Sequence, residues 1–170
     1  MSRNASSYLI SALRKVNLRP GSNVLDLGSG FGRHSVLLSE MGMFVVALDI
    51  DLERLRHVAY QTSATTSSVA RVMGDGNRDL PFSNSAFALV VAVHLTWAGV
   101  VERAIPVLKK GGYLMVETFG GQGSNWRDLP RAGALRSELD GAFDMLDYRE
   151  RAVGPEDAEA VAVKLLARKR

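Results

Sequence analysis

The sequence contains no cysteine. This absence excludes disulfide bonds, thiolate zinc sites, CxxC redox chemistry and a cysteine nucleophile. The sequence also lacks an apolar run of the length needed to span a bilayer. Residues 1–7 have neither the apolar segment nor the cleavage pattern of a signal peptide. We therefore expect a cytoplasmic protein that does not enter a membrane.

The sequence also has little excess of one charge over the other. The formal net charge is +3, and the last three residues, Arg168, Lys169 and Arg170, account for all of it. We expect residues 168–170 to form a solvated basic tail, and we expect no nucleic-acid partner for the balanced remainder. The three histidines are scattered along the chain, so no metal-ligand spacing is present and we expect no metal.

The 170 residues fit a single domain, with 46% hydrophobic and 23% charged residues. Short β-branched runs alternate with segments of helical period. Helices are expected over residues 4–18, from the turn near 32 to 41, and over 52–61, 100–108 and 131–139. Strands are expected over residues 24–27, 44–48, 69–73, 87–93, 113–119, 143–153 and 159–167. The alternation predicts an α/β fold with a parallel sheet, and the last two strands predict an antiparallel hairpin.

One segment is particularly informative. The buried strand 24–27 runs directly into a turn that contains Gly28, Gly30 and Gly32, and a helix follows. Such a turn lets a ligand approach the backbone and the positive end of a helix. Asp49 follows Gly28 by 21 positions, at the end of the next strand, where a carboxylate can accept the hydroxyls of a ribose. The dinucleotide fingerprint G-x-G-x-x-G fails, because position 33 is arginine.

The pattern D-x-G-x-G-x-G, which starts at Asp26, resembles motif I of the class I S-adenosylmethionine-dependent methyltransferases. Four further segments resemble later parts of that family in the same order. They are residues 45–51, 74–82, 87–91 and 108–114. One departure is Ala88, where the family usually has aspartate.

The resemblance implies a Rossmann-like, doubly wound sheet of order 3-2-1-4-5-7-6 with strand 7 antiparallel. It implies S-adenosylmethionine as the cofactor, S-adenosylhomocysteine as its product and no metal. Asp49 would meet the ribose, and Asp75 with its neighbours would meet the adenine. Asp26 would orient the loop, approach the methionine amino group or be structural. The cofactor-binding residues so implied are Asp26, Gly28, Ser29, Gly30, Gly32, Asp49, Ile50, Asp75, Gly76, Asn77 and His94.

His94 follows the fourth strand, close to where the transferable methyl would lie, and it is our candidate catalytic residue. The alternative is that it only lines the pocket. Residues 1–20 would form a lid helix and residues 120–130 a substrate loop. The aromatic residues expected near the acceptor are Tyr8, Trp97, Phe119 and Trp126, although each also suits ordinary packing. Asp51 is expected to cap the helix that follows it.

The function expected from this resemblance is in-line methyl transfer to a small molecule, in a compact enzyme similar to the tellurite-resistance or thiopurine branch. Two alternatives stay open. One is an RNA or protein methyltransferase, and the other is a non-catalytic S-adenosylmethionine-binding regulatory subunit. Because the lid is short, a homodimer that closes the pocket is a further hypothesis.

Overall fold

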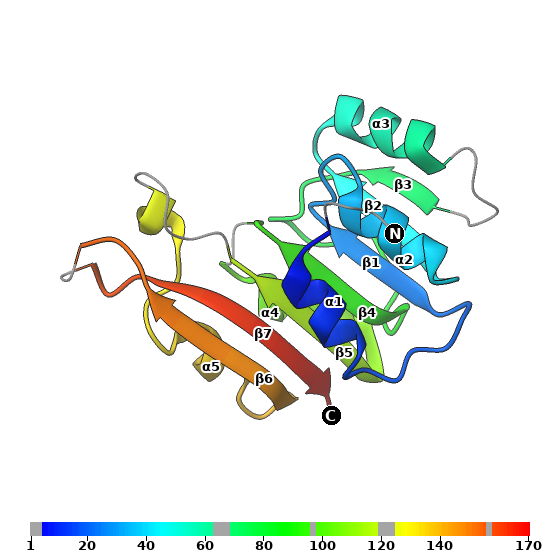
Figure 1. Ribbon diagram of the computed structural model, residues 1–170. Helices are drawn as coiled ribbons and strands as arrows, with labels where there is room; N and C mark the ends of the chain where they lie inside the picture. The colour runs from blue at the N-terminus through cyan, green and yellow to red at the C-terminus, as the bar shows by residue number, and fades with distance from the viewer. Residues whose placement is uncertain (1–4, 63–68, 96–97, 119–124, 156–157) are drawn as a thin grey trace.

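The computed structural model describes residues 5–62, 69–95, 98–118, 125–155 and 158–170. Seven strands form one sheet of order β3-β2-β1-β4-β5-β7-β6, as Figure 1 shows. The strands are β1 (Asn23–Leu27), β2 (Phe44–Asp49), β3 (Val69–Met73), β4 (Phe87–Val93), β5 (Leu108–Glu117), β6 (Phe143–Ala152) and β7 (Val161–Lys169). β7 is antiparallel to both β5 and β6, and the other pairs are parallel. The order and the antiparallel strand predicted from the sequence are confirmed.

Helices cover both faces of the sheet (Figure 1). They are α1 (Ser7–Leu13), α2 (Arg33–Glu40), α3 (Leu52–Thr62), α4 (Val100–Val107) and α5 (Ala134–Leu139), with the 3-10 helix η1 at Asn125–Asp128. α1 and α2 pack on one face, and α4 and α5 pack on the other. α3 packs on Ala47 of β2. Ala47 lies on the same face of the sheet as Val45, which packs with α1 and α2, so α3 covers that face as well.

The central strands β1 and β4 are buried on both faces. Leu25 and Val90 pack against the α4 side, and Val24 and Leu89 pack against the α1 side. This burial explains why both strands appear in the sequence as continuous apolar runs instead of alternating ones. It also fixes the carboxyl ends of β1 and β4 side by side, at the edge where the glycine turn begins.

The first helix is shorter than the expected 4–18. It starts after Ser6, whose hydroxyl accepts hydrogen bonds from the N–H groups of Tyr8 and Leu9. A serine at this position satisfies N–H groups that lack a partner within the helix. The helix ends at Leu13.

The fifth strand starts earlier than the expected 113–119. α4 ends at Val107, and Lys109 to Gly112 belong to β5. The register shifts from Phe87–Leu108 to Leu89–Tyr113, so they bulge opposite the single residue Ala88.

The expected solvated tail is wrong as well. Lys169 lies in β7, and its ammonium group donates hydrogen bonds to the carbonyls of Ile105 and Leu108, near the C-terminal end of α4. Arg168 Nε donates to the carbonyl of Gly111 at 3.2 Å, and Arg170 pairs with Asp144 at 2.7 Å. The cations that the sequence suggests as a free tail therefore bind the fold.

Candidate functional site

A cleft of about 720 Å³ opens at the carboxyl ends of β1 and β4, beside α2 and α3. Its walls come from the glycine turn, the first turn of α2, α3 and the end of β4. The lining residues are Gly28, Ser29, Gly30, Phe31, Arg33, His34, Arg54, His57, Gln61, Val93 and His94. Ligands of open α/β sheets bind at this edge, at the point where the chain leaves neighbouring strands toward opposite faces of the sheet.

The three glycines of the turn have different neighbours. Gly28 and Gly32 have positive φ angles, and a Cβ atom on either would lie within 3 Å of Leu95 or Val58 respectively. A Cβ on Gly30, where φ is +56°, would meet no atom within 4 Å. Gly28 and Gly32 therefore pack closely against neighbouring side chains, whereas the space beside the Cα atom of Gly30 is empty.

Asp49 braces the turn from the end of β2. Its Oδ2 accepts the N–H of Gly30 at 2.7 Å, and its Oδ1 accepts the N–H of Asp51 at 2.9 Å. Only 4% of Asp49 is exposed. Asp51 in turn accepts the N–H groups of Glu53 and Arg54, which confirms its expected role at the start of α3.

Asp26 lies behind the turn. It is 1% exposed, and Ser35 of α2 donates its hydroxyl to Asp26 Oδ2 at 2.6 Å. Burial raises the pKa of this carboxyl from 3.8 to about 6, against the lowering effect of the Ser35 bonds and Arg33. The contact connects Asp26 of β1 with Ser35 of α2.

His34 lines the cleft from α2 and is almost fully buried. Its Nε2 accepts the backbone N–H of Ser6 at 3.2 Å. Burial, reinforced by the neighbouring Arg33, lowers the pKa of His34 from 6.5 to about 4. His34 is therefore a neutral acceptor that holds the segment before α1.

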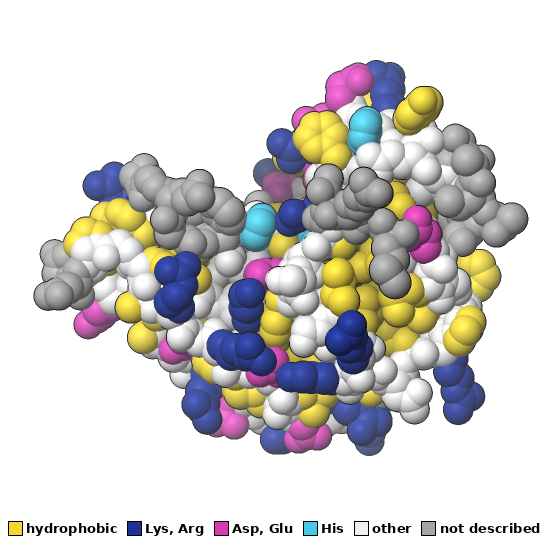
Figure 2. All heavy atoms as spheres, viewed as in Figure 1, with side chains coloured by type: hydrophobic (Ala, Val, Ile, Leu, Met, Phe, Trp, Pro, Cys, Tyr) yellow, Lys and Arg dark blue, Asp and Glu magenta, His cyan; other side chains and the backbone are white. Residues whose placement is uncertain are grey.

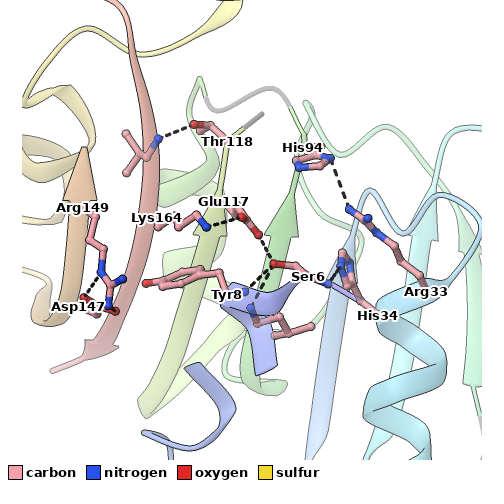
Figure 3. Close-up of polar contacts among 12 residues, drawn as sticks. Ser6, Tyr8, Arg33, His34, His94, Glu117, Thr118, Asp147, Arg149 and Lys164 are labelled. Carbon is pink, nitrogen blue, oxygen red and sulfur yellow. Dashed lines mark hydrogen bonds and ion pairs between the residues drawn. The ribbon is translucent and has the colours of Figure 1, made fainter. Parts of the chain in front are cut away.

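His94, the residue after the end of β4, has a left-handed backbone conformation, with φ at 60°. This conformation is uncommon outside glycine, although histidine is among the residues that tolerate it. The His94 N–H donates to the Glu117 carbonyl at 2.8 Å, and the Arg33 guanidinium lies 3.5 Å from its Nδ1. Burial and Arg33 lower the pKa of His94. The ring lies at the edge of the cleft, facing the Arg33 guanidinium (Figure 3).

The predicted adenine segment forms a separate turn beside the cleft. Asp75 Oδ1 accepts the N–H of Asn77 at 2.9 Å. Gly76 is buried, and Leu95 lies against both Gly76 and Gly28. Ile50 is 67% exposed at the end of β2. Leu95 therefore separates this turn from the glycine turn, a contact that no sequence pattern indicated.

Of the four predicted aromatic residues, the structure describes Tyr8 and Trp126, and it places these two apart. Tyr8 is 4% exposed, and its side chain packs from α1 into the core. Trp126 packs against Gly154, at the far end of the hairpin that β6 and β7 form. Trp97 and Phe119 lie outside the described residues, as do residues 120–124 of the predicted substrate loop.

A second cleft, of about 470 Å³, shares His94 with the first. The sequence did not indicate this cleft, because its other walls come from three separate strands. The other lining residues are Glu117, Thr118, Arg149, Glu150, Arg151, Ala162, Val163 and Lys164. Ser6 links the two clefts: its hydroxyl donates to Glu117 and its N–H to His34 (Figure 3).

No group of three or more His, Cys, Asp or Glu side chains is arranged to hold a metal ion within the part that the structure describes. Over the same residues, no helix has both the length and the apolar character required for crossing a membrane.

The chain is similar to known proteins in sequence. The family model described as "Methyltransferase domain" matches residues 24–112, more than half of the chain. A demethylmenaquinone methyltransferase of Corynebacterium glutamicum is 34% identical over 112 residues, which cover 62% of this chain and 45% of that relative. A protein-L-isoaspartate O-methyltransferase of Methylorubrum populi is 26% identical over 132 residues, covering 77% of this chain and 61% of that relative. The chain thus spans about half the length of the demethylmenaquinone relative.

The fold is shared with solved structures at lower identity. TehB from Haemophilus influenzae superposes with a TM-score of 0.75 at 18% identity, over 98% of this chain and 63% of TehB. MccD superposes with a TM-score of 0.75 at 11% identity, over 96% of each chain. The cyclase SpnF has a TM-score of 0.74 at 18% identity, over 94% of this chain and 78% of SpnF. Together with the family match, the glycine turn and the strand order, these findings show that the chain belongs to the class I S-adenosylmethionine-dependent methyltransferases.

Proposed function

We propose that this chain binds S-adenosylmethionine in the 720 Å³ cleft and transfers its methyl group to a small-molecule acceptor. The observation that carries the proposal is the glycine turn. Gly30 leaves space where any side chain would intrude, and the buried Ser29 hydroxyl that lines the same cleft has no hydrogen-bond partner among the described residues. Buried polar atoms normally have partners, so a ligand that supplies one fits this position.

The residues around the turn suit the parts of this cofactor. Asp49 already accepts two N–H groups, but each carboxylate oxygen has two lone pairs, so capacity for ribose hydroxyls is left. Ile50 offers an exposed apolar side chain at the end of β2, suited to one face of the adenine. Arg33 lines the cleft and matches the carboxylate of the methionine part.

When bound, the cofactor supplies an activated methyl group: a bond forms from the acceptor atom to the methyl carbon, the carbon–sulfur bond breaks, and its electron pair stays on sulfur. The protein's part is to align the acceptor and exclude water. His94 lines both clefts, so it lies where acceptor and cofactor meet. Its lowered pKa keeps the imidazole neutral near pH 7, the form that can accept a proton from a protonated acceptor.

The size of the second cleft, about 470 Å³, supports a small acceptor. The relatives named for demethylmenaquinone also act on a small molecule by their names. The basic residues 168–170, which were the local support for a nucleic-acid substrate, are instead used in contacts with the fold.

Calorimetric titration with S-adenosylhomocysteine tests the cofactor site, with NAD as the matched control. We expect saturable binding of the first ligand only. At about 100 times its dissociation constant, it should add roughly 2.7 kcal/mol to the free energy of unfolding, or several degrees in Tm. Binding of NAD with equal affinity, or of neither ligand, would overturn the proposal. Transfer of labelled methyl to a panel of small acceptors then tests catalysis.

A further inference from the structure

The second cleft is lined by charged side chains of both signs, which are Glu117, Arg149, Glu150, Arg151 and Lys164. On the face shown in Figure 2, Asp and Glu side chains lie among the Lys and Arg side chains that cover β6 and β7. The strand register brings opposite charges together, because Lys164 of β7 is paired with Glu117 of β5 on one side and with Arg149 of β6 on the other. Directly paired residues lie on the same face of a sheet.

The two cations in this register have carboxylate partners. Glu117 pairs with Lys164 at 3.2 Å. Arg149 pairs with Asp147 at 3.3 Å, and Lys15 also contacts Asp147, at 2.9 Å. The hydrogen bonds from Lys15 and Arg149 hold the pKa of Asp147 below its usual range, so this carboxylate keeps its negative charge.

The two remaining charged residues of the cleft are not free either. Glu150 Oε1 accepts hydrogen bonds from the N–H of Gly133 and the hydroxyl of Tyr148. Arg151 also interacts with a neighbouring group. A charged acceptor would therefore have to compete with an existing partner for any of these side chains.

An uncharged acceptor avoids this competition. Breaking a partly buried ion pair leaves one charge without its partner, which is strongly unfavourable. Of the ion-paired residues that line the cleft, Glu117 is the most enclosed: its side chain is 12% exposed, against 43% for Lys164 and 63% for Arg149. A ligand without charge leaves the pair of Glu117 and Lys164 intact and needs only hydrogen bonds from the cleft.

Two groups at the end of β5 can supply those hydrogen bonds (Figure 3). The Glu117 carboxylate accepts from Ser6 and faces Lys164, but each of its oxygens has a second lone pair. The hydroxyl oxygen of Thr118 accepts the Val163 N–H at 2.7 Å, and the hydroxyl hydrogen has no acceptor among the described residues. The end of β5 thus offers both an acceptor and a donor. A hydroxyl group matches both, whereas an ammonium group only donates and a carboxylate only accepts.

We propose that the second cleft binds an uncharged methyl acceptor that carries a hydroxyl group, which donates to Glu117 and accepts from Thr118. The proposal rests on the methyl transfer proposed above, because His94 joins this cleft to the cofactor cleft. It restricts the acceptor to alcohols and phenols that have no charged group at this position.

Four benzene derivatives of similar size test the proposal as binding probes at pH 7. They are benzyl alcohol, benzyl methyl ether, benzoate and benzylammonium. Ligand-observed NMR measures the affinity of each for the wild type, with and without saturating S-adenosylhomocysteine. Benzyl alcohol should bind at least about fivefold more tightly than the other three. The ether lacks the O–H group, and either ion would have to disturb an ion pair.

Two variants and a matched control test the role of the ion pair. Glu117→Gln leaves Lys164 without its carboxylate, so benzoate should bind this variant at least about fivefold more tightly than it binds the wild type. Lys164→Gln leaves Glu117 without its cation, so benzylammonium should gain affinity in the same way. Glu53→Gln is the control: it also removes a carboxylate from an ion pair, with Arg56, but Glu53 lies on α3 and is not among the described residues that line either cleft. Its preferences should equal those of the wild type.

Both variants should fold. Glutamine at position 117 keeps an acceptor for the Ser6 hydroxyl, and the Lys164 side chain is only half-buried. Circular dichroism checks this before the probes are added.

The proposal is overturned if benzyl alcohol does not bind, or if benzoate or benzylammonium binds the wild type as tightly as benzyl alcohol does. Ion affinities that stay unchanged in both Glu117→Gln and Lys164→Gln would also overturn it. The proposed function fails separately, if S-adenosylhomocysteine does not bind. A preference for benzyl alcohol in such a protein would support the hydroxyl site and contradict the proposed methyl transfer.

Discussion

Asp49 is hydrogen-bonded to the backbone of Gly30, at 2.7 Å from Oδ2 to N. The carboxylate at the end of β2 therefore shapes the glycine turn before any ligand arrives. The same side chain also holds Asp51 at the start of α3. Strand β2, the turn and α3 are thereby connected through one buried carboxylate, for which we also propose a role in binding the ribose.

Asp49→Ala should reduce both stability and cofactor affinity. The substitution leaves two N–H groups without their acceptor, which costs about 1–3 kcal/mol of unfolding free energy. We expect S-adenosylhomocysteine to bind at least about tenfold more weakly. Urea unfolding and calorimetric titration measure the two effects. Asp51→Ala is the control, since it removes the cap of α3 and should lower stability with little change in affinity. Equal loss of affinity in both variants would contradict this assignment.

Gly30→Ala and Gly32→Ala should differ in a way that locates the ligand. Both residues have positive φ, so each substitution costs about 1–2 kcal/mol in backbone strain. A Cβ on Gly32 would also lie 2.6 Å from Val58, which adds about 1–3 kcal/mol. We expect Gly32→Ala to be the less stable protein. Gly30→Ala should lose more cofactor affinity per unit of stability lost. A Gly30→Ala variant that binds S-adenosylhomocysteine as wild type does would place the ligand elsewhere.

Asp26→Asn should change how stability depends on pH. Folding raises the pKa of Asp26 from 3.8 to about 6, so the folded state holds this proton more tightly. Its contribution is fully present below pH 3.8 and is lost as pH rises through about 6. Asparagine has no such loss and can still accept from Ser35. At pH 7 we expect Asp26→Asn to be as stable as the wild type or more stable, by on the order of 1–3 kcal/mol. Urea unfolding at several pH values measures it, and a clearly less stable variant at pH 7 would count against a costly buried charge.

His34→Gln should remove a pH dependence of stability whose sign is opposite to that of Asp26. Folding lowers the pKa of His34 from 6.5 to about 4, so its contribution is fully present above pH 6.5 and is lost as pH falls through about 4. Glutamine keeps an acceptor for the Ser6 N–H. Relative to the wild type, the variant should gain on the order of 2–3 kcal/mol between pH 7 and pH 4. The same urea series checks this prediction, and parallel curves for the two proteins would refute it.

Lys169→Met should destabilise the protein, because the ammonium group binds the carbonyls of Ile105 and Leu108 near the end of α4. We expect a loss of about 1–2 kcal/mol. Lys110→Met is the matched control: Lys110 is exposed on β5 and should change stability by less than about 0.5 kcal/mol. Thermal and urea unfolding distinguish the two variants. Equal effects would mean that the Lys169 contacts contribute little.

Sequence patterns predicted the strands well, because each buried strand is a short apolar run with a clear boundary. Val24 to Leu27 and Phe87 to Val93 are examples, since helices cover both faces of each. The sequence was less informative about local ends. The cation near the end of α4 is Lys169, which belongs to a strand far along the chain. Only the tertiary structure brings the two together.

The glycine turn of the proposed cofactor cleft was predictable from the sequence because it lies between one strand and the helix that follows it. The second cleft was not. Glu117, Lys164 and Arg149 come from three strands, and only the register of β5, β7 and β6 aligns them. Tyr8 shows a related difficulty. Tyr8 occupies a helical position that suits a lid as well as a core, and burial decided for the core.

The position of β7 between β5 and β6 has a consequence for biosynthesis. Among the described strands, β6 pairs with β7 alone, yet β7 follows β6 in the chain. During translation β6 therefore emerges before its partner exists, and it must wait as an unpaired apolar and charged segment. The last strand then enters an interior position in the sheet. The second cleft, which is lined by residues of β5, β6 and β7, is completed at this final step, whereas the glycine turn lies far earlier in the chain.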